Sequence, residues 1–446
     1  MFMAYNGGAT AAIVDSLQER PGQGRWSEEG VGTLGAMDKI GMTISAPIFG
    51  LIMQQSRGGT ISRILMITLT LSSAALMTFS SSTTHEVMLA AKLVIGFTEQ
   101  SFWNWAPLWI NRFGAEHTEI WLTLSTGGMA AGLGNGLGMV AGDLLGIRAF
   151  AAEALVLFIL LIAFACGTRP EDVDPMREES GSDVGLRNVF CILCSSVHFM
   201  SICLAYASAS YAQTGAQFLW IEIHHVFWPD IFTSDPEMNT IASVVVLCIS
   251  GLGGVIGMFL ASRQNFDDES SLLLFTQRMF GFAVIGSLLT LGSVGVRWYY
   301  GDYCLGYLSV VTIWFGTLLI FVGLGATPAP LNSLCMSASR AVHGEGIGMG
   351  VFQFVNNLFG FALGMYLPMA TAGLADSLHW EKSSEYLVAW ATIILGIVMG
   401  FLWMCGSRYH MHVSETQAEE EDDEGYANAG VRKRNGLLES RDLAVA

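Results

Sequence analysis

Long apolar segments recur along almost the whole chain and leave little sequence for any other kind of domain. A helix that crosses a bilayer needs roughly 20 predominantly apolar residues. We predict such helices at 1–17, 31–54, 62–81, 86–111, 120–141, 147–167, 190–221, 239–261, 274–296, 304–328, 345–371 and 385–406. Only 13% of the residues are charged, against roughly 25% in soluble domains. The sequence therefore predicts an all-α membrane protein of about twelve transmembrane helices.

Two connections are longer than the rest, and they divide the chain into four parts. We predict an N-terminal helix bundle over 1–167, a cytoplasmic linker over 168–189, a C-terminal helix bundle over 190–406 and a disordered acidic tail over 407–446. The tail contains the acidic run 419–424, and runs of like charge are typically solvated. The first segment is shorter than a full span, so we expect the first helix to be truncated at Met1.

The distribution of Lys and Arg predicts the orientation in the membrane. With a cytoplasmic N-terminus, 14 of the 21 basic residues lie inside, 5 lie outside and 2 lie within spans. Cytoplasmic loops carry an excess of Lys and Arg. We therefore expect a multi-pass protein with both termini in the cytoplasm, and the sequence leaves open whether the membrane is the plasma membrane or an internal one.

Charged residues inside the predicted spans are the sharpest functional signal. A charge at a span centre costs roughly 2.5–3.5 kcal/mol on insertion scales, and such residues normally face a cavity or a partner. Lys92 and Glu99 are about two helical turns apart, so they share one face of the fourth helix. Glu99 is a candidate proton-binding or substrate-facing carboxylate in a midplane cavity, and the alternative is an ion pair that only holds helices in register.

Three more charged residues fall within the predicted spans of the first half. Asp38 and Lys39 are adjacent and project about 100° apart. We expect them to be unable to face one another, so that each needs its own partner, which for Lys39 is Glu99 or Asp15. Glu153 lies close to a predicted extracellular end, where a carboxylate is typically interfacial.

Uncharged polar and aromatic residues extend the candidate cavity. Trp103 and Asn104 follow Glu99 along the chain, and an indole with an amide can hold a polar headgroup. Tryptophans at a helix end are also common interface anchors. Further candidates are the polar residues of the seventh and eleventh helices, Gln217, Gln353 and Asn356. We interpret His224 and His225 as loop residues.

The fourth helix resembles a known family. Its segment KLVIGFTEQS (92–101) is similar to the signature of Spinster-type transporters, an Arg, three residues, Gly, two residues and Glu. An Ala-Pro step at 106–107, the glycine-rich segment 132–142 and the segment APIFG at 46–50 extend the resemblance. It implies the major facilitator fold, two bundles of six helices that work by alternating access. It also implies an amphiphilic lipid or organic anion as substrate, with protons carried by an aspartate of helix 1 and by Glu99.

This chain departs from the family pattern at several positions. Lys92 replaces the arginine and keeps its charge without the planar fork. Asn6 falls where the family has its helix 1 aspartate, which removes one proton site. Gln54 and Gln55 stand where a loop motif of the wider superfamily has Asp and Arg. These departures imply a divergent member of the family.

Three other functions compete with this interpretation. A uniporter or exchanger of a small polar metabolite would have the same fold, and a non-transporting sensor or scaffold could use the acidic tail. A membrane enzyme is disfavoured because the sequence lacks a nucleophile with its base and a nucleotide motif. Cys191 and Cys194 are too few ligands for a zinc site, and no basic nucleic-acid footprint is present. We expect no cofactor. The expected partners are the lipid bilayer, a small-molecule or lipid substrate, and protons.

Overall fold

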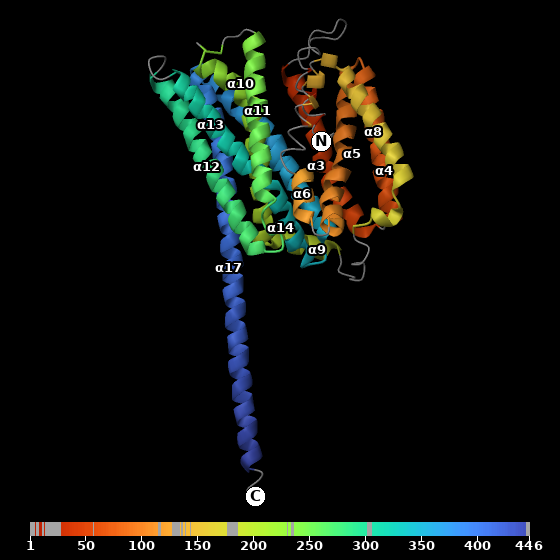
Figure 1. The fold of residues 1–446 in the computed structure, drawn as a ribbon, viewed down its shortest axis with the longest axis vertical. Helices are drawn as coiled ribbons and strands as arrows, with labels where there is room; N and C mark the ends of the chain where they lie inside the picture. Colours follow the sequence, from red (N-terminus) through yellow and green to blue (C-terminus); the bar gives the residue numbers. More distant parts are fainter. Residues whose placement is uncertain are drawn as a thin grey trace.

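The computed structural model describes the chain apart from residues 1–4, 6–8, 11–12, 14–27, 57, 115–116, 127–133, 135–136, 139, 143, 176–185, 230, 233–235, 301–305 and 443–446. All the regular structure in the described residues is helical. Figure 1 shows two adjacent groups of helices and one long helix that leaves them at one end. The all-α membrane fold predicted from the apolar segments is confirmed.

The N-terminal bundle consists of helices that precede the linker. They are α3 (Glu28–Gln55), α4 (Gly58–Ser81), α5 (His85–Phe113), α6 (Thr118–Thr126) and α8 (Arg148–Gly167). The linker contributes a short 3-10 helix, η2 (Pro170–Asp172), and α9 (Leu186–Ser195). Isolated described residues of the first segment, among them Tyr5 and Thr10, are also helical.

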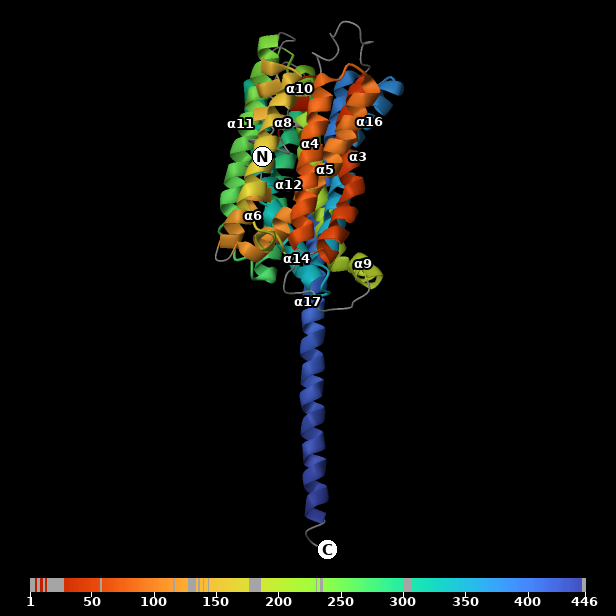
Figure 2. The ribbon, with the colours of Figure 1, turned by 90° about the vertical axis from the view of Figure 1, so that its right-hand side faces the viewer.

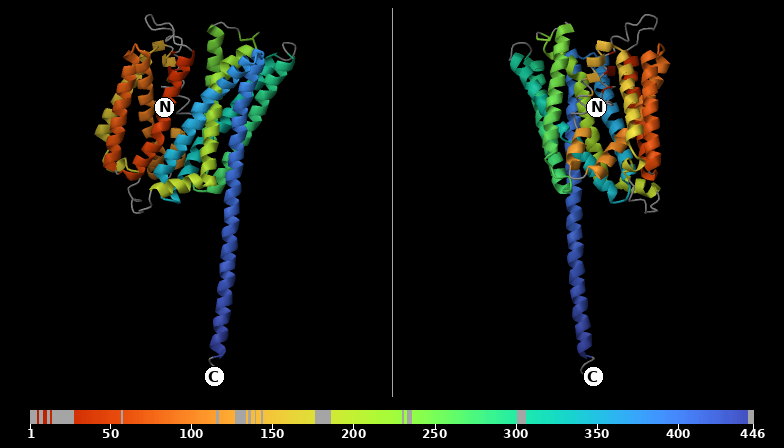
Figure 3. Two further views of the ribbon diagram at one scale, coloured as in Figure 1. Left: turned by 180° about the vertical axis from the view of Figure 1, so that it is seen from behind. Right: turned by 45° about the vertical axis from the view of Figure 1, so that its right-hand side comes forward.

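The C-terminal bundle follows with longer elements. They are α10 (Val197–Phe227), α11 (Pro236–Ala261), α12 (Glu269–Tyr300), α13 (Gly306–Gly325), α14 (Pro328–Arg340), α15 (Glu345–Val355), the π-helix η4 (Asn356–Ala362), α16 (Leu363–Ser377) and α17 (Lys382–Asp442). Figure 3 shows the two bundles side by side from behind.

Among the described residues, seven helices are long and apolar enough to cross a membrane, or eight if one bent pair forms a single span. Helix α5 falls outside this set because polar residues such as Lys92, Glu99 and Asn104 lower its hydropathy. It nevertheless packs between α3 and α4. Helix α5, which carries Lys92 and Glu99, is therefore less apolar than its neighbours α3 and α4.

The expected seventh helix, 190–221, is not continuous. Helices α9 and α10 meet at 74° around Ser196, whose side chain accepts a hydrogen bond from the backbone N–H of Phe199 at 3.2 Å. A serine in this position caps a new helix N-terminus. Figure 2 shows α9 at the end of the bundle from which α17 projects.

The chain after residue 407 also differs from the expected disordered tail. Helix α17 continues to Asp442 and projects from the bundle as a single helix (Figure 2). Between residues 407 and 442 the segment contains six Glu, four Arg and three Ala, which are strong helix formers. Local propensity therefore accounts for a helix here.

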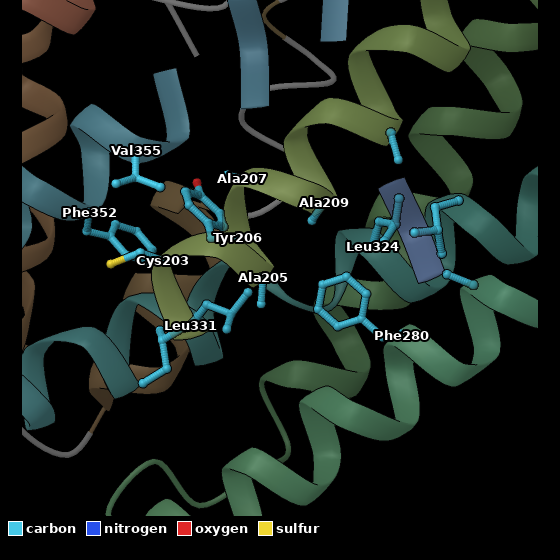
Figure 4. Packing of buried hydrophobic residues seen from close by; sticks show 14 of the residues in the cluster. Cys203, Ala205, Tyr206, Ala207, Ala209, Phe280, Leu324, Leu331, Phe352 and Val355 are labelled. Carbon is cyan, nitrogen blue, oxygen red and sulfur yellow. The ribbon is translucent and has the colours of Figure 1, made fainter. Parts of the chain in front are cut away.

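The core of the C-terminal bundle gathers around α10. Figure 4 shows Tyr206 of α10 facing Phe352 of α15, with Phe280 and Leu324 on the other side of α10. The rings of Tyr206 and Phe352 are stacked with their centroids 4.6 Å apart. This packing fixes α15, and with it η4, against α10.

The two bundles touch along α3 and α15 through glycine. A Cβ added at Gly50 would lie 2.7 Å from both the carbonyl oxygen of Gly346 and the Cα of Gly350. The two backbones are therefore in direct contact. At the end of this seam, the Gln54 side chain donates to His343 O at 3.0 Å and accepts from Gly346 N at 2.8 Å.

Candidate functional site

A close crossing of α3 and α5 brings the embedded charges together. A Cβ at Gly41 of α3 would collide with the backbone of Leu93, and one at Gly96 of α5 would collide with the backbone of Asp38. Small residues let helices in a membrane approach this closely. The crossing places Asp38 beside the stretch of α5 between Lys92 and Glu99.

Asp38 and Lys39 form an ion pair, so the expectation that they need separate partners is wrong. Lys39 Nζ lies 2.9 Å from Asp38 Oδ2. Successive Cβ atoms do diverge, but the four-carbon stem of lysine is long enough to fold back onto its neighbour. The charge of Glu99 also acts on Lys39. Asp15, the other expected partner, lies outside the described residues.

Lys39 also reaches the other bundle. Its ammonium lies 5.3 Å from the centroid of the Phe361 ring on η4, within the range of a cation–π contact. The side chain is 16% exposed, against 7% for its partner Asp38. The pair therefore connects the interior of the N-terminal bundle to the interface between the bundles.

Lys92 is held in an aromatic cage. Its side chain is almost fully buried, with a residue exposure of 1%. Its ammonium lies 5.1 Å from the Phe79 ring centroid and 4.8 Å from that of Phe150. It also donates to Thr10 Oγ1 at 2.5 Å. Ring faces and a hydroxyl replace part of the hydration that this ammonium would have in water.

Two carboxylates complete the cluster. Glu99 is 5% exposed, and the charges of Asp38, Glu153, Lys39 and Lys92 all act on it. Glu153 is 3% exposed and belongs to the same network, so the interfacial position expected for it is wrong. Sequence reasoning missed Glu153 because the coverage of a helix end by neighbouring helices is a tertiary property.

The five residues form a charge cluster with an uneven balance. It contains three carboxylates, Asp38, Glu99 and Glu153, and two ammonium groups, Lys39 and Lys92. With every group ionised, the cluster would carry one uncompensated negative charge in a site that excludes water. Isolated charge in such a medium is costly, and the group takes up a proton or a partner instead. Within the described part of the chain, no group of His, Cys, Asp and Glu is arranged to hold a metal ion.

A bridge of side-chain amides adjoins the charge cluster. Asn357 of η4 donates to Gln100 Oε1 at 2.8 Å, and Gln100 donates to Asn104 Oδ1 at 2.7 Å. Asn104 then donates to the backbone oxygen of Ala46 at 2.7 Å. This amide bridge joins the two bundles one residue away from Glu99. Asn104, predicted to line the cavity, is therefore hydrogen-bonded within the amide bridge.

The π-helix η4 supplies further side-chain amides next to the amide bridge. Asn356 and Asn357 are both fully buried or nearly so, and the Oδ1 atom of each has no hydrogen-bond partner among the described residues. Gln353, one turn earlier on α15, is 2% exposed and has its amide nitrogen 3.9 Å from Met349 Sδ. π-Helical turns are frequent at functional sites because they re-aim side chains.

The remaining predicted site residues are placed as follows. Trp103 is half-buried on α5, while Trp105 and Trp109 donate to linker carbonyls, those of Val173 at 3.0 Å and Asp172 at 2.7 Å. These two tryptophans hold the linker to the bundle. Asn6 and the side chain of Gln217 lie outside the described residues.

His224 is buried, contrary to the expectation of a loop residue. Its Nδ1 lies 2.7 Å from the backbone oxygen of Trp220, and its Nε2 accepts from Trp314 Nε1 at 2.9 Å. Since an indole nitrogen can only donate, His224 is the neutral tautomer with its proton on Nδ1. The C-terminal bundle therefore places an uncharged histidine among aromatic rings.

Comparison with known proteins supports the fold alone. No protein-family profile and no curated protein matches the sequence. The solved major facilitator proton:xylose symporter with bound 6-bromo-6-deoxy-D-glucose is similar with a TM-score of 0.62 at 11% identity, over 89% of this chain and 92% of that one. The E. coli fucose:proton symporter is similar with a TM-score of 0.59 at 13% identity, over 91% of this chain and 96% of that one. The chain thus has the fold of major facilitator transporters.

Proposed function

We propose that the protein is a proton-coupled secondary transporter that works by alternating access. The charge cluster carries this proposal, because three buried carboxylates share one site with the buried Lys92 and the partly buried Lys39. One proton balances the cluster, and loss of that proton leaves a net negative charge. A site whose charge balance requires one exchangeable proton is suited to coupling.

The contacts of the cluster supply a link to movement of the bundles. Lys39 touches Asp38 in one bundle and the Phe361 ring in the other. A change in the charge of the cluster alters the field on Lys39 and therefore its contact across the interface. The glycine seam of Gly50, Gly346 and Gly350 gives the bundles a surface along which they can separate and rejoin.

For the substrate, the geometry favours a small polar solute. Both ammonium groups of the cluster are engaged by protein groups, and the amide oxygens of Asn356 and Asn357 have no donor among the described residues. Buried acceptors favour a ligand that brings hydrogen-bond donors, such as a polyol. The two solved neighbours are named as proton symporters of xylose and fucose.

An amphiphilic lipid or organic anion is the second candidate substrate. The resemblance of residues 92–101 to Spinster-type transporters supports it. An anionic headgroup would have to displace Asp38 from Lys39, or the aromatic rings from Lys92. We further propose that the protein is multi-pass with both termini in the cytoplasm, which the bias of Lys and Arg supports.

Uptake into proteoliposomes tests the proposal. The panel contains radiolabelled sugars and polyols, amino acids, organic acids and lysophospholipids, each with and without an imposed pH gradient. We expect gradient-dependent uptake of a polar solute that is lost in Glu99→Gln and kept in Glu86→Gln, an exposed residue on the same helix. Lipid uptake would favour the second candidate, and uptake indifferent to the gradient and to Glu99→Gln would contradict proton coupling.

A further inference from the structure

Glu153 is the most completely enclosed carboxylate of the charge cluster. Both of its carboxylate oxygens are buried and have no hydrogen-bond partner among the described residues. One turn earlier on the same helix, Phe150 stacks edge-on against Phe79, with the ring centroids 4.6 Å apart. Glu153 thus belongs to the helix that packs on α4 through this aromatic pair.

The charged and titratable groups that act on Glu153 come from three other segments. Lys92 of α5 is the cation, Asp38 of α3 is an anion, and Tyr5 of the first segment interacts with it as well. Glu99 of α5 adds a second anion. Helix α4 contributes the Phe79 ring and the Ser73 hydroxyl, which donates to the backbone oxygen of Ala154 at 3.2 Å and not to the carboxylate.

The other two carboxylates have closer or more numerous cations. Asp38 Oδ2 lies 2.9 Å from Lys39 Nζ, while its Oδ1 has no hydrogen-bond partner among the described residues. The charges of both ammonium groups act on Glu99. Of the three carboxylates, Glu153 is the one with both oxygens buried and without a partner in the described part of the chain. Two carboxylates and two ammonium groups then balance, and one carboxyl group is left over.

We propose that Glu153 is the proton-binding residue of the cluster and is a neutral carboxylic acid while Asp38 and Glu99 are ionised. An ionised carboxylate without hydrogen bonds in an apolar site is strongly disfavoured, whereas the acid form is tolerated. Loss of the proton would create an anion beside Lys92 and draw the ammonium out of its cage of Phe79 and Phe150. The link from this proton to transport rests on the function proposed above.

Infrared difference spectroscopy of the purified full chain tests the assignment without transport. A protonated carboxylic acid has a carbonyl stretch that an ionised carboxylate lacks and that shifts in D2O. We expect this band at neutral pH in the wild type and its loss in Glu153→Gln. A wild type without the band, or a band that survives in Glu153→Gln, would overturn the proposal.

A complementary variant keeps the test open if Glu153→Gln does not fold. Glu153→Asp keeps a carboxyl group at this position, and the band is then expected to persist with a shifted frequency. A band that keeps its wild-type frequency in Glu153→Asp would place the proton on another residue. Should the band behave as expected while no solute is taken up in any pH gradient, the proton site stands and the proposed transport function fails.

Discussion

The two bundles handle buried polarity in different ways. The N-terminal bundle buries a group of charged side chains in its middle, with Lys92, Glu99 and Glu153 all at most 5% exposed, beside neutral ones such as Gln100. The C-terminal bundle uses neutral groups at comparable depth, such as Asn357 and the uncharged His224. Its buried charged residues lie in the end turns of helices: Arg297 in the last turn of α12, Glu345 in the first turn of α15 and Glu385 in the first turn of α17.

This difference suggests a division of labour within one fold. Charged groups in a low dielectric respond strongly to a single proton, whereas neutral amides respond to the shape and the hydrogen-bond donors of a ligand. The contacts of Lys39 with Phe361 and of Gln100 with Asn357 join the two regions at the interface. Coupling between an ion and a solute requires such a junction.

The largest expected effect is loss of stability in Lys92→Met. The substitution removes one of the two cations that compensate the buried carboxylates of the charge cluster, and removing one partner of a buried charge pair typically costs about 3–5 kcal/mol. Chemical unfolding in mixed micelles measures it, and Lys382→Met, at an exposed residue of the C-terminal bundle, should stay within roughly 0.5 kcal/mol. Adding Glu99→Gln, which removes one of the two ionised carboxylates of the charge cluster, should restore part of the loss. If Lys92→Met lowers the free energy of unfolding no more than Lys382→Met does, the N-terminal bundle does not depend on its buried charges as the comparison of the two bundles requires.

A second prediction concerns pH and the C-terminal bundle. His224 lies in the last turn of α10, at the end of the helix. Burial and, to a smaller extent, the neighbouring His225 lower the pKa of His224 from 6.5 to about 4, against the opposite effect of the hydrogen bond to the Trp220 backbone oxygen. The unfolded chain therefore binds a proton on His224 between these values while the folded chain does not, so stability falls as pH drops below 6.5 and levels off below 4.

The full loss for His224 is roughly 3 kcal/mol at pH 4 and below, since one pKa unit corresponds to about 1.4 kcal/mol. Unfolding measured from pH 7 to pH 4 tests it, with His224→Gln expected to flatten the pH slope. His410→Gln, at an exposed histidine of α17, should keep the slope. An unchanged slope in His224→Gln would mean that His224 is not the neutral, buried group described here.

A third, smaller effect is expected at the glycine seam between the bundles. In Gly50→Leu the side chain has to enter a space already filled by the Gly346 and Gly350 backbones. Overpacking typically costs about 1–3 kcal/mol, which shifts the balance between joined and separated bundles by roughly 5–150-fold. Uptake should fall accordingly, while Gly59→Leu, where a Cβ has open space, should be neutral. Equal uptake in both variants would mean that the glycine seam has no role in transport.

The parts of this architecture that follow from local sequence were the predictable ones. Apolar length indicated the helices, and the rarity of charge in a membrane singled out Asp38, Lys92 and Glu99. Contacts between distant residues were not predictable: Gln100 and Asn357 are 257 residues apart in the chain. The Asp38–Lys39 pair depends on how one lysine side chain folds back. The burial of Glu153 and His224 depends on which helices cover them, and no periodicity of α8 or α10 reports that.

The smallest effect is expected from Asn357→Ala in the amide bridge. The variant removes the donor to Gln100 Oε1, and a lost buried hydrogen bond typically costs about 1–3 kcal/mol. Because the bridge joins the bundles beside a charge cluster that stays intact, we expect the apparent Km for a polar solute to change while the pH dependence of uptake does not. Asn188→Ala, at an exposed residue of α9, is the matched control. If the pH dependence changes together with the Km, the neutral and charged regions act as one site, and the division of labour between the bundles is wrong.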